Sequence, residues 1–158
     1  MHIVLVEPEI PPNTGNIARL CAATGSTLHL IEPLGFEIDD RRLKRAGMDY
    51  WKFTSWNRWA NWSAFEDGLT EGARLWFVES GGSRLYTEVA YGADDFLVFG
   101  RETAGLPVSL LKEHVDSWIR IPMFNAEARS LNLSNCAALV LFEALRQQGF
   151  AGEIQTGA

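Results

Sequence analysis

The chain has 158 residues, of which 47% are hydrophobic, and its 14 Lys and Arg against 20 Asp and Glu give a net charge of −6. This length favours one domain with a single core, and two cysteines are too few for a disulfide scaffold. The longest apolar runs fall far short of the roughly 20 residues that cross a bilayer, so we expect no membrane segment and a cytoplasmic protein.

Short apolar runs rich in β-branched or aromatic residues predict strands, and longer periodic segments between them predict helices. Thr14 and Gly25 are the expected N-cap and C-cap of the first helix. The alternation predicts one α/β domain over residues 1–158, with a mostly parallel sheet flanked by helices and a ligand crevice beyond the carboxyl ends of its strands. The tail 149–158 is expected to fray. In chain order, the predicted elements are strand 2–7, helix 15–24, strand 27–32, helix 57–69, strand 73–79, strand 96–100, helix 107–115, strand 117–121 and helix 132–148.

The last predicted helix is apolar around nearly its whole circumference, which is unusual for a helix on a protein surface. Such a helix is either threaded through the core or half covered by a second subunit, and the two arrangements are compatible. Its apolar residues are Leu133, Ala137, Ala138, Leu139, Val140, Leu141, Phe142, Ala144 and Leu145.

Residues 100–107 (GRETAGLP) follow a predicted strand but do not form a triphosphate-binding loop, because Lys and Ser or Thr are missing where that loop needs them. In one interpretation, Gly100 and Gly105 only turn the chain into the next helix. In the other, the turn binds a ligand, since Glu102 and Thr103 lie at the carboxyl end of a strand.

Two further segments concentrate polar residues at helix starts. In PPNTGNIAR (11–19), Asn16 and Arg19 are expected on one helix face near an N-terminus that attracts anions; the alternative is a capped turn with Arg19 in solvent. In residues 121–139, more polar side chains crowd the helix start than capping requires, which predicts a ligand or, alternatively, a multiply capped helix. These polar residues are Ser130, Asn132, Ser134 and Asn135.

The acidic balance excludes a protein that coats nucleic acid through bulk positive charge, so an RNA site needs a local basic patch. Residues 41–58 offer one, because they hold six of the 14 cations beside a single acid. The candidate RNA-binding residues are Arg41, Arg42, Lys44, Arg45, Lys52 and Arg58. The tryptophans of this region either stack on bases or, as we expect for most of them, pack in the core. No His or Cys has the spacing of a metal ligand set, so we predict no metal.

Together, NTGNIAR, FGRETAGLP and IPM followed by RSLNLSN resemble the three motifs of the SpoU branch of the SPOUT methyltransferases, and are most similar to its small TrmL (YibK) type. EPEIPPNTGN, IEPLGF and KRAGMDY agree with this subfamily. The resemblance implies a SPOUT fold with a C-terminal trefoil knot. It also implies methyl transfer from S-adenosylmethionine to the ribose 2′-hydroxyl of a tRNA wobble pyrimidine, position 34 of the anticodon stem-loop. The alternatives are another tRNA or rRNA nucleotide, or a protein that binds cofactor and RNA without catalysis.

When the family's residues are carried over one by one, the resemblance implies a cofactor pocket and a set of catalytic residues. It also implies a homodimer that builds each active site from both subunits. The implied cofactor-binding residues are Val78, Gly100, Glu102, Gly105, Ile121, Met123, Ser130 and Leu131. The implied catalytic residues are Arg19, Asn16, Ser130 and Asn132. Because a guanidinium normally stays charged at neutral pH, we favour a positioning role over a general-base role for Arg19.

Two departures limit the transfer from the family. The segment 124–128 is one residue longer than in the relatives, which affects the loop against the cofactor. Phe142 stands where several relatives have Tyr, so a hydroxyl at that position is absent here.

Overall fold

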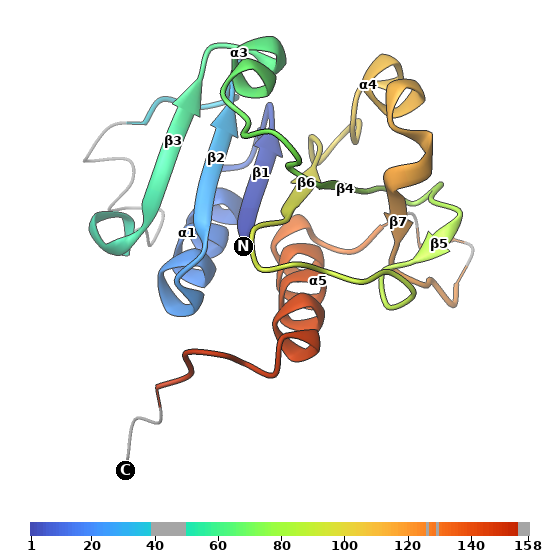
Figure 1. The fold of residues 1–158 in the computed structure, drawn as a ribbon. Helices are drawn as coiled ribbons and strands as arrows, with labels where there is room; N and C mark the ends of the chain where they lie inside the picture. Colours follow the sequence, from blue (N-terminus) through green and yellow to red (C-terminus); the bar gives the residue numbers. More distant parts are fainter. Residues whose placement is uncertain (39–49, 126, 129, 155–158) are drawn as a thin grey trace.

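The computed structural model describes residues 1–38, 50–125, 127–128 and 130–154. Over these residues it forms a seven-stranded sheet in the order β3-β2-β1-β6-β4-β7-β5, and every pair of neighbouring strands is parallel (Figure 1). The predicted α/β class and parallel sheet are therefore confirmed. The strands are β1 (His2–Val6), β2 (Thr27–Ile31), β3 (Ser55–Trp59), β4 (Leu75–Val78), β5 (Arg84–Leu85), β6 (Phe96–Phe99) and β7 (Trp118–Arg120).

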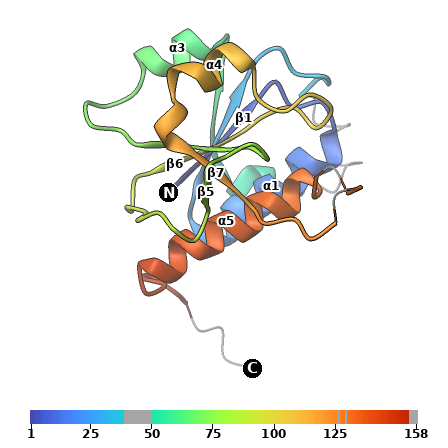
Figure 2. The ribbon, with the colours of Figure 1, turned by 90° about the vertical axis from the view of Figure 1, so that its right-hand side faces the viewer.

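Helices cover both faces of the sheet (Figure 2). On β1, Ile3 and Leu5 pack in the cluster formed with α1 and α5, while Val4 and Val6 pack in the cluster formed with α3 and α4. Strands buried on both faces are what a parallel sheet between helices requires. One layer consists of α1 (Pro11–Thr24) and α5 (Leu133–Gln147), the other of α3 (Trp62–Asp67) and α4 (Val108–Glu113), with short 3₁₀ helices η1 (Trp51–Phe53) and η2 (Val115–Ser117) between elements.

Helix α1 begins four residues earlier than its prediction, at Pro11. Proline is well suited to this position, because the first-turn N–H groups of a helix have no partner within the helix. The prediction of Thr14 as N-cap is wrong, since Thr14 is buried inside the helix. Gly25 is the C-cap, as predicted, and adopts the left-handed conformation with φ 65°.

The predicted helix 57–69 is wrong in its first part, which is strand β3 paired in parallel with β2. Trp56 and Trp59 have the three-residue spacing of a helix face, but they lie on opposite faces of the sheet. Tertiary pairing at the sheet edge therefore overrides the local pattern. Helix α3 begins only at Trp62, after Asn61 accepts a hydrogen bond from the Ala64 N–H at 2.8 Å. Strand β5, two residues long, is too short to be predicted from periodicity.

Helix α5 is buried along one face and open along another. Ala137, Val140 and Ala144 are buried against the sheet and α1, whereas Leu139 is 42% exposed and Phe142 is 49% exposed. None of the helices in the described residues is long and apolar enough to cross a membrane.

A buried histidine links β1, β2 and β3. The Trp59 indole N–H donates to His29 Nδ1 at 3.1 Å, so His29 Nε2 carries the ring hydrogen and faces His2 Nδ1 at 3.0 Å. A proton on His29 Nδ1 would point at the indole N–H and abolish this hydrogen bond, because Nδ1 could no longer accept. Burial lowers the pKa of His29 from 6.5 to about 4, and the charge of nearby His2 contributes in the same direction.

We predict that acid weakens the fold through His29. The unfolded chain binds a proton at His29 below pH 6.5, whereas the native chain binds it only below about pH 4, so stability is complete above pH 6.5 and is lost as pH falls toward 4. The expected loss of unfolding free energy is about 3 kcal/mol, measured by urea denaturation between pH 7.5 and 4. In His29→Gln the same pH change should have a clearly smaller effect. An equal pH dependence in both proteins would contradict this assignment.

Candidate active site

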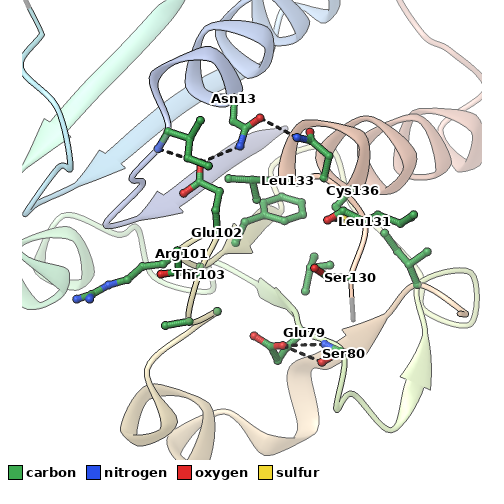
Figure 3. A pocket seen from close by; sticks show the side chains of 18 of the residues that line it. Asn13, Glu79, Ser80, Arg101, Glu102, Thr103, Ser130, Leu131, Leu133 and Cys136 are labelled. Carbon is green, nitrogen blue, oxygen red and sulfur yellow. Dashed lines mark hydrogen bonds between the residues drawn. The ribbon is translucent and has the colours of Figure 1, made fainter. Parts of the chain in front are cut away.

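A cavity of about 400 Å³ lies at the carboxyl ends of the central strands, where the parallel sheet predicts a ligand crevice (Figure 3). Three segments form most of its wall: the loop after β4, the turn after β6 and the chain from β7 to the start of α5. The first turn of α1 adds Ile10 and Asn13. The volume is in the range of small-molecule sites.

All the residues implied for cofactor binding lie on this cavity, although they come from separate segments of the chain. The shared feature is their position at or directly after the end of a strand or before α5. Val78 is the last residue of β4; Gly100, Glu102 and Gly105 belong to the turn after β6; and Ile121, Met123, Ser130 and Leu131 belong to the segment between β7 and α5.

The turn after β6 folds back on itself and requires both of its glycines. Arg101 and Gly105 exchange backbone hydrogen bonds of 3.1 and 2.9 Å. A Cβ atom on Gly100 would lie 2.1 Å from the Gly105 carbonyl carbon, and Gly105 has a φ of +68°. Arg101 also forms an ion pair with Glu7, which follows β1. The structural and the ligand interpretation of this segment are thus compatible, because the tight turn is itself a wall of the cavity.

Asn13 connects three wall segments by hydrogen bonds. Its Nδ2 donates to Glu102 Oε1 at 3.0 Å, and its Oδ1 accepts from Asn132 Nδ2 at 2.9 Å (Figure 3). Asn132 is the N-cap of α5, where its Oδ1 accepts from the Ser134 N–H and hydroxyl. The sequence analysis did not select Asn13. The available signal was its position four residues before Ile17, on the helix face that must be buried.

Glu102 serves the start of α1. Its Oε2 accepts from the Glu9 N–H at 2.8 Å, and its Oε1 accepts from the Ile10 N–H at 3.2 Å in addition to Asn13. Ile10, the N-cap residue, has no side-chain oxygen that could cap the helix. From the turn after β6, Glu102 accepts from the N–H groups of the N-cap residue and of the residue before it, and its negative charge is favourable at a helix N-terminus.

Glu79 is a second carboxylate on the cavity wall, and the sequence analysis did not select it either. Its Oε2 accepts from the Leu106 N–H at 3.1 Å, while its Oε1 accepts from the Ser80 N–H at 2.9 Å and the Ser80 hydroxyl at 3.1 Å. The carboxylate therefore connects the loop after β4 to the turn after β6; Figure 3 shows its hydrogen bonds to Ser80. Its position at the carboxyl end of a predicted strand was the signal that could have found it.

Within one chain, only two of the four implied catalytic residues lie on the cavity. Ser130 and Asn132 lie on the cavity. Asn16 and Arg19 do not line it; both are exposed on α1, and the Arg19 guanidinium lies 4.6 Å from the centroid of the Tyr50 ring.

The proposed basic patch is only partly within the described structure. Arg41, Arg42, Lys44 and Arg45 lie outside the described residues. Lys52 is exposed on η1, and Arg58 on β3 pairs with Glu32 at 2.5 Å.

The tryptophans of this region pack against the two core clusters, which confirms the core interpretation for Trp51, Trp56, Trp59 and Trp62. Among the described residues, no three His, Cys, Asp or Glu side chains are grouped to hold a metal ion.

Comparison with known proteins agrees with this geometry. Residues 1–142 match the model of the SpoU rRNA Methylase family. A Saccharophagus degradans protein named tRNA (cytidine(34)-2'-O)-methyltransferase is 54% identical over 153 residues, which cover 96% of this chain and 97% of that protein. An Aeromonas hydrophila protein of the same name is 47% identical, with 98% of this chain and 99% of that protein covered.

Solved structures share the fold. A structure described as giving insights into "the 2-OH methylation of C/U34 on tRNA" has a TM-score of 0.86 at 40% identity and covers 94% of this chain and 96% of its own. An AdoMet-bound rRNA methyltransferase from Sinorhizobium meliloti has a TM-score of 0.80 at 29% identity, covering 92% of this chain and 55% of its own. The family match over residues 1–142 and the relatives at about half identity lead to one conclusion: the chain belongs to the SpoU rRNA Methylase family.

Proposed function

We propose that this protein transfers a methyl group from S-adenosylmethionine to the ribose 2′-hydroxyl of tRNA nucleotide 34, the wobble pyrimidine. The observation that carries the proposal is the near-complete coverage of relatives with that name, at 54% and 47% identity. The cavity at the strand ends supports it, because the second and third motif segments form much of its wall and Asn13 of the first motif joins them. A cytoplasmic location, where tRNA is available, is part of the proposal.

The cavity fits S-adenosylmethionine in size and in chemistry. Val78, Ile121 and Leu131 offer apolar surface for a purine ring, and the backbone of the turn after β6 offers hydrogen-bonding groups at close range. When bound, the cofactor supplies an electrophilic methyl group on a sulfonium cation. Glu79 adds negative charge to the wall, which suits a cationic ligand.

We propose that the carboxyl-terminal part of the chain is knotted. A crossing of the chain over β7 supports this topology. Strands β4 and β5 pair with Ile119 of β7 from opposite sides, so the residues that connect β4 to β5 must cross β7. A Cβ atom on Gly82 would lie 2.7 Å from the Ile119 carbonyl carbon, so the crossing segment touches the backbone of β7. The chain then continues past this crossing into α5.

We propose that the protein is a homodimer with composite sites. Leu139 and Phe142 form an exposed apolar part of α5 that a second copy would cover. Asn16 and Arg19 lie away from the cavity of their own chain, so the proposal assigns them to the cavity of the partner. There, Arg19 would hold an RNA phosphate and position the 2′-hydroxyl in line with the methyl group.

The activity is tested by nucleoside mass spectrometry of an unmodified tRNA incubated with the protein and methyl-labelled S-adenosylmethionine. We expect the label in 2′-O-methylcytidine or 2′-O-methyluridine from position 34. The matched control is the same tRNA with a 2′-deoxynucleotide at position 34, which lacks only the acceptor hydroxyl and should remain unlabelled. Label in that control, or label in rRNA but not in tRNA, would contradict the proposal.

The composite site is tested by mixing two inactive variants. Arg19→Ala should lower the single-turnover rate at least about 100-fold with cofactor affinity retained, because it removes a positioning group. Leu131→Trp should fill the cavity and abolish cofactor binding. Random heterodimers contain one site with an open cavity and an intact Arg19, so the refolded mixture should recover about a quarter of the wild-type rate. If the mixture is as inactive as the two parent variants, Arg19 acts at the cavity of its own chain.

A further inference from the structure

Two aromatic side chains of the segment around η1 are open to solvent, and one of them, Tyr50, lies against Arg19. Tyr50 is 38% exposed and Phe53 is 67% exposed, at the two ends of η1. Between them, Trp51 packs against the core cluster and fixes the short helix to the sheet side. The exposure of these two rings is therefore not a sign of a loose segment.

A buried threonine fixes the same segment to α1. The Thr54 hydroxyl lies within hydrogen-bonding distance of two carbonyl oxygens, that of Ala18 at 2.9 Å and that of Tyr50 at 3.0 Å. Ala18 directly precedes Arg19 in α1. The Tyr50 ring and the Arg19 side chain are consequently held at a fixed relative position by backbone contacts as well as by their own stacking.

Each exposed ring carries a cation on its face. The Arg19 guanidinium carbon lies 4.6 Å from the Tyr50 centroid, and Lys52 Nζ lies 4.8 Å from the Phe53 centroid. Within the described part of the chain, no carboxylate forms an ion pair with either cation. The surface thus combines flat apolar rings with available positive charge, on a protein whose net charge is −6.

We infer that this surface, formed by Arg19, Tyr50, Lys52 and Phe53 and called the stacking platform below, binds unpaired bases of the RNA substrate. Single-stranded nucleic acid presents aromatic bases next to phosphates, and proteins bind it by stacking rings on the bases and placing cations along the backbone. The inference rests on the proposed function and deepens it. Arg19 is both a platform residue and the residue proposed to position the target ribose. The platform would therefore hold bases adjacent to the nucleotide that is methylated.

A protein partner fits this surface less well than RNA. Burying two cations without opposing carboxylates in an interface would remove them from water without compensation, and lysine is depleted in the centre of protein interfaces. Coverage by a second copy of this chain is therefore the competing outcome of the test.

The test measures binding of an anticodon stem-loop by fluorescence anisotropy, with a fully paired RNA of equal phosphate number as the second ligand. Phe53→Ala should weaken stem-loop binding about 5- to 150-fold, the range for loss of one stacked base, and Phe53→Trp should restore it. Tyr50→Ala should weaken binding similarly, whereas Tyr50→Phe keeps the ring and should bind normally. Binding of the paired RNA should change little in all four variants. Val115→Ala, which shortens an exposed apolar side chain on η2, is the matched control.

Two results would overturn the inference. If both alanine variants bind the stem-loop with wild-type affinity, the platform does not bind RNA bases. A loss of affinity accompanied by dissociation to monomers in light scattering would assign the platform to a second copy. Failure of the proposed function is separate: if wild-type protein leaves position 34 unmethylated but Phe53→Ala still weakens stem-loop binding selectively, the platform stands and the target nucleotide is wrong.

Discussion

One buried amide, Asn13, connects the segments from which the cavity is built. It belongs to the first turn of α1, donates to Glu102 after β6 and accepts from Asn132 at the start of α5. A buried polar group left without its partner costs about 1–3 kcal/mol, so each of these three segments is stable only in the position that satisfies the other two. The width and shape of the cavity follow from this constraint.

The same polar groups stabilise the fold and shape the site. Glu102 fixes the chain that enters α1 by accepting from the Glu9 and Ile10 N–H groups, and Glu79 connects two loops of the wall. Gly100 allows the turn after β6 to close and leaves backbone, instead of a side chain, facing the cavity. The sequence patterns could not decide between structural and ligand roles, because residues that stabilise the fold here also line the cavity.

Local patterns predicted the parallel sheet and most of its flanking helices, since these depend on apolar runs, whereas the cofactor-pocket residues were implied by the resemblance of three motifs to a known family. Contacts between distant segments were not predictable in the same way. Residues 57–59 were predicted as the start of a helix, but pairing with β2 makes them part of strand β3. The resemblance implied that Asn16 and Arg19 share an active site with Ser130, and only the structure shows that both lie away from the cavity of their own chain. Asn13 and Glu79 acquire their roles from partners remote in sequence.

The most direct test of this account is a double-mutant cycle between Glu102→Ala and Asn132→Ala, measured by urea denaturation. These side chains share Asn13 as a partner, and no hydrogen bond joins them directly in the described structure. The account predicts a coupling free energy of about 1 kcal/mol or more, which should disappear in an Asn13→Ala background. Additive losses, within about 0.3–0.5 kcal/mol, would show that the three segments are held independently and would contradict the account.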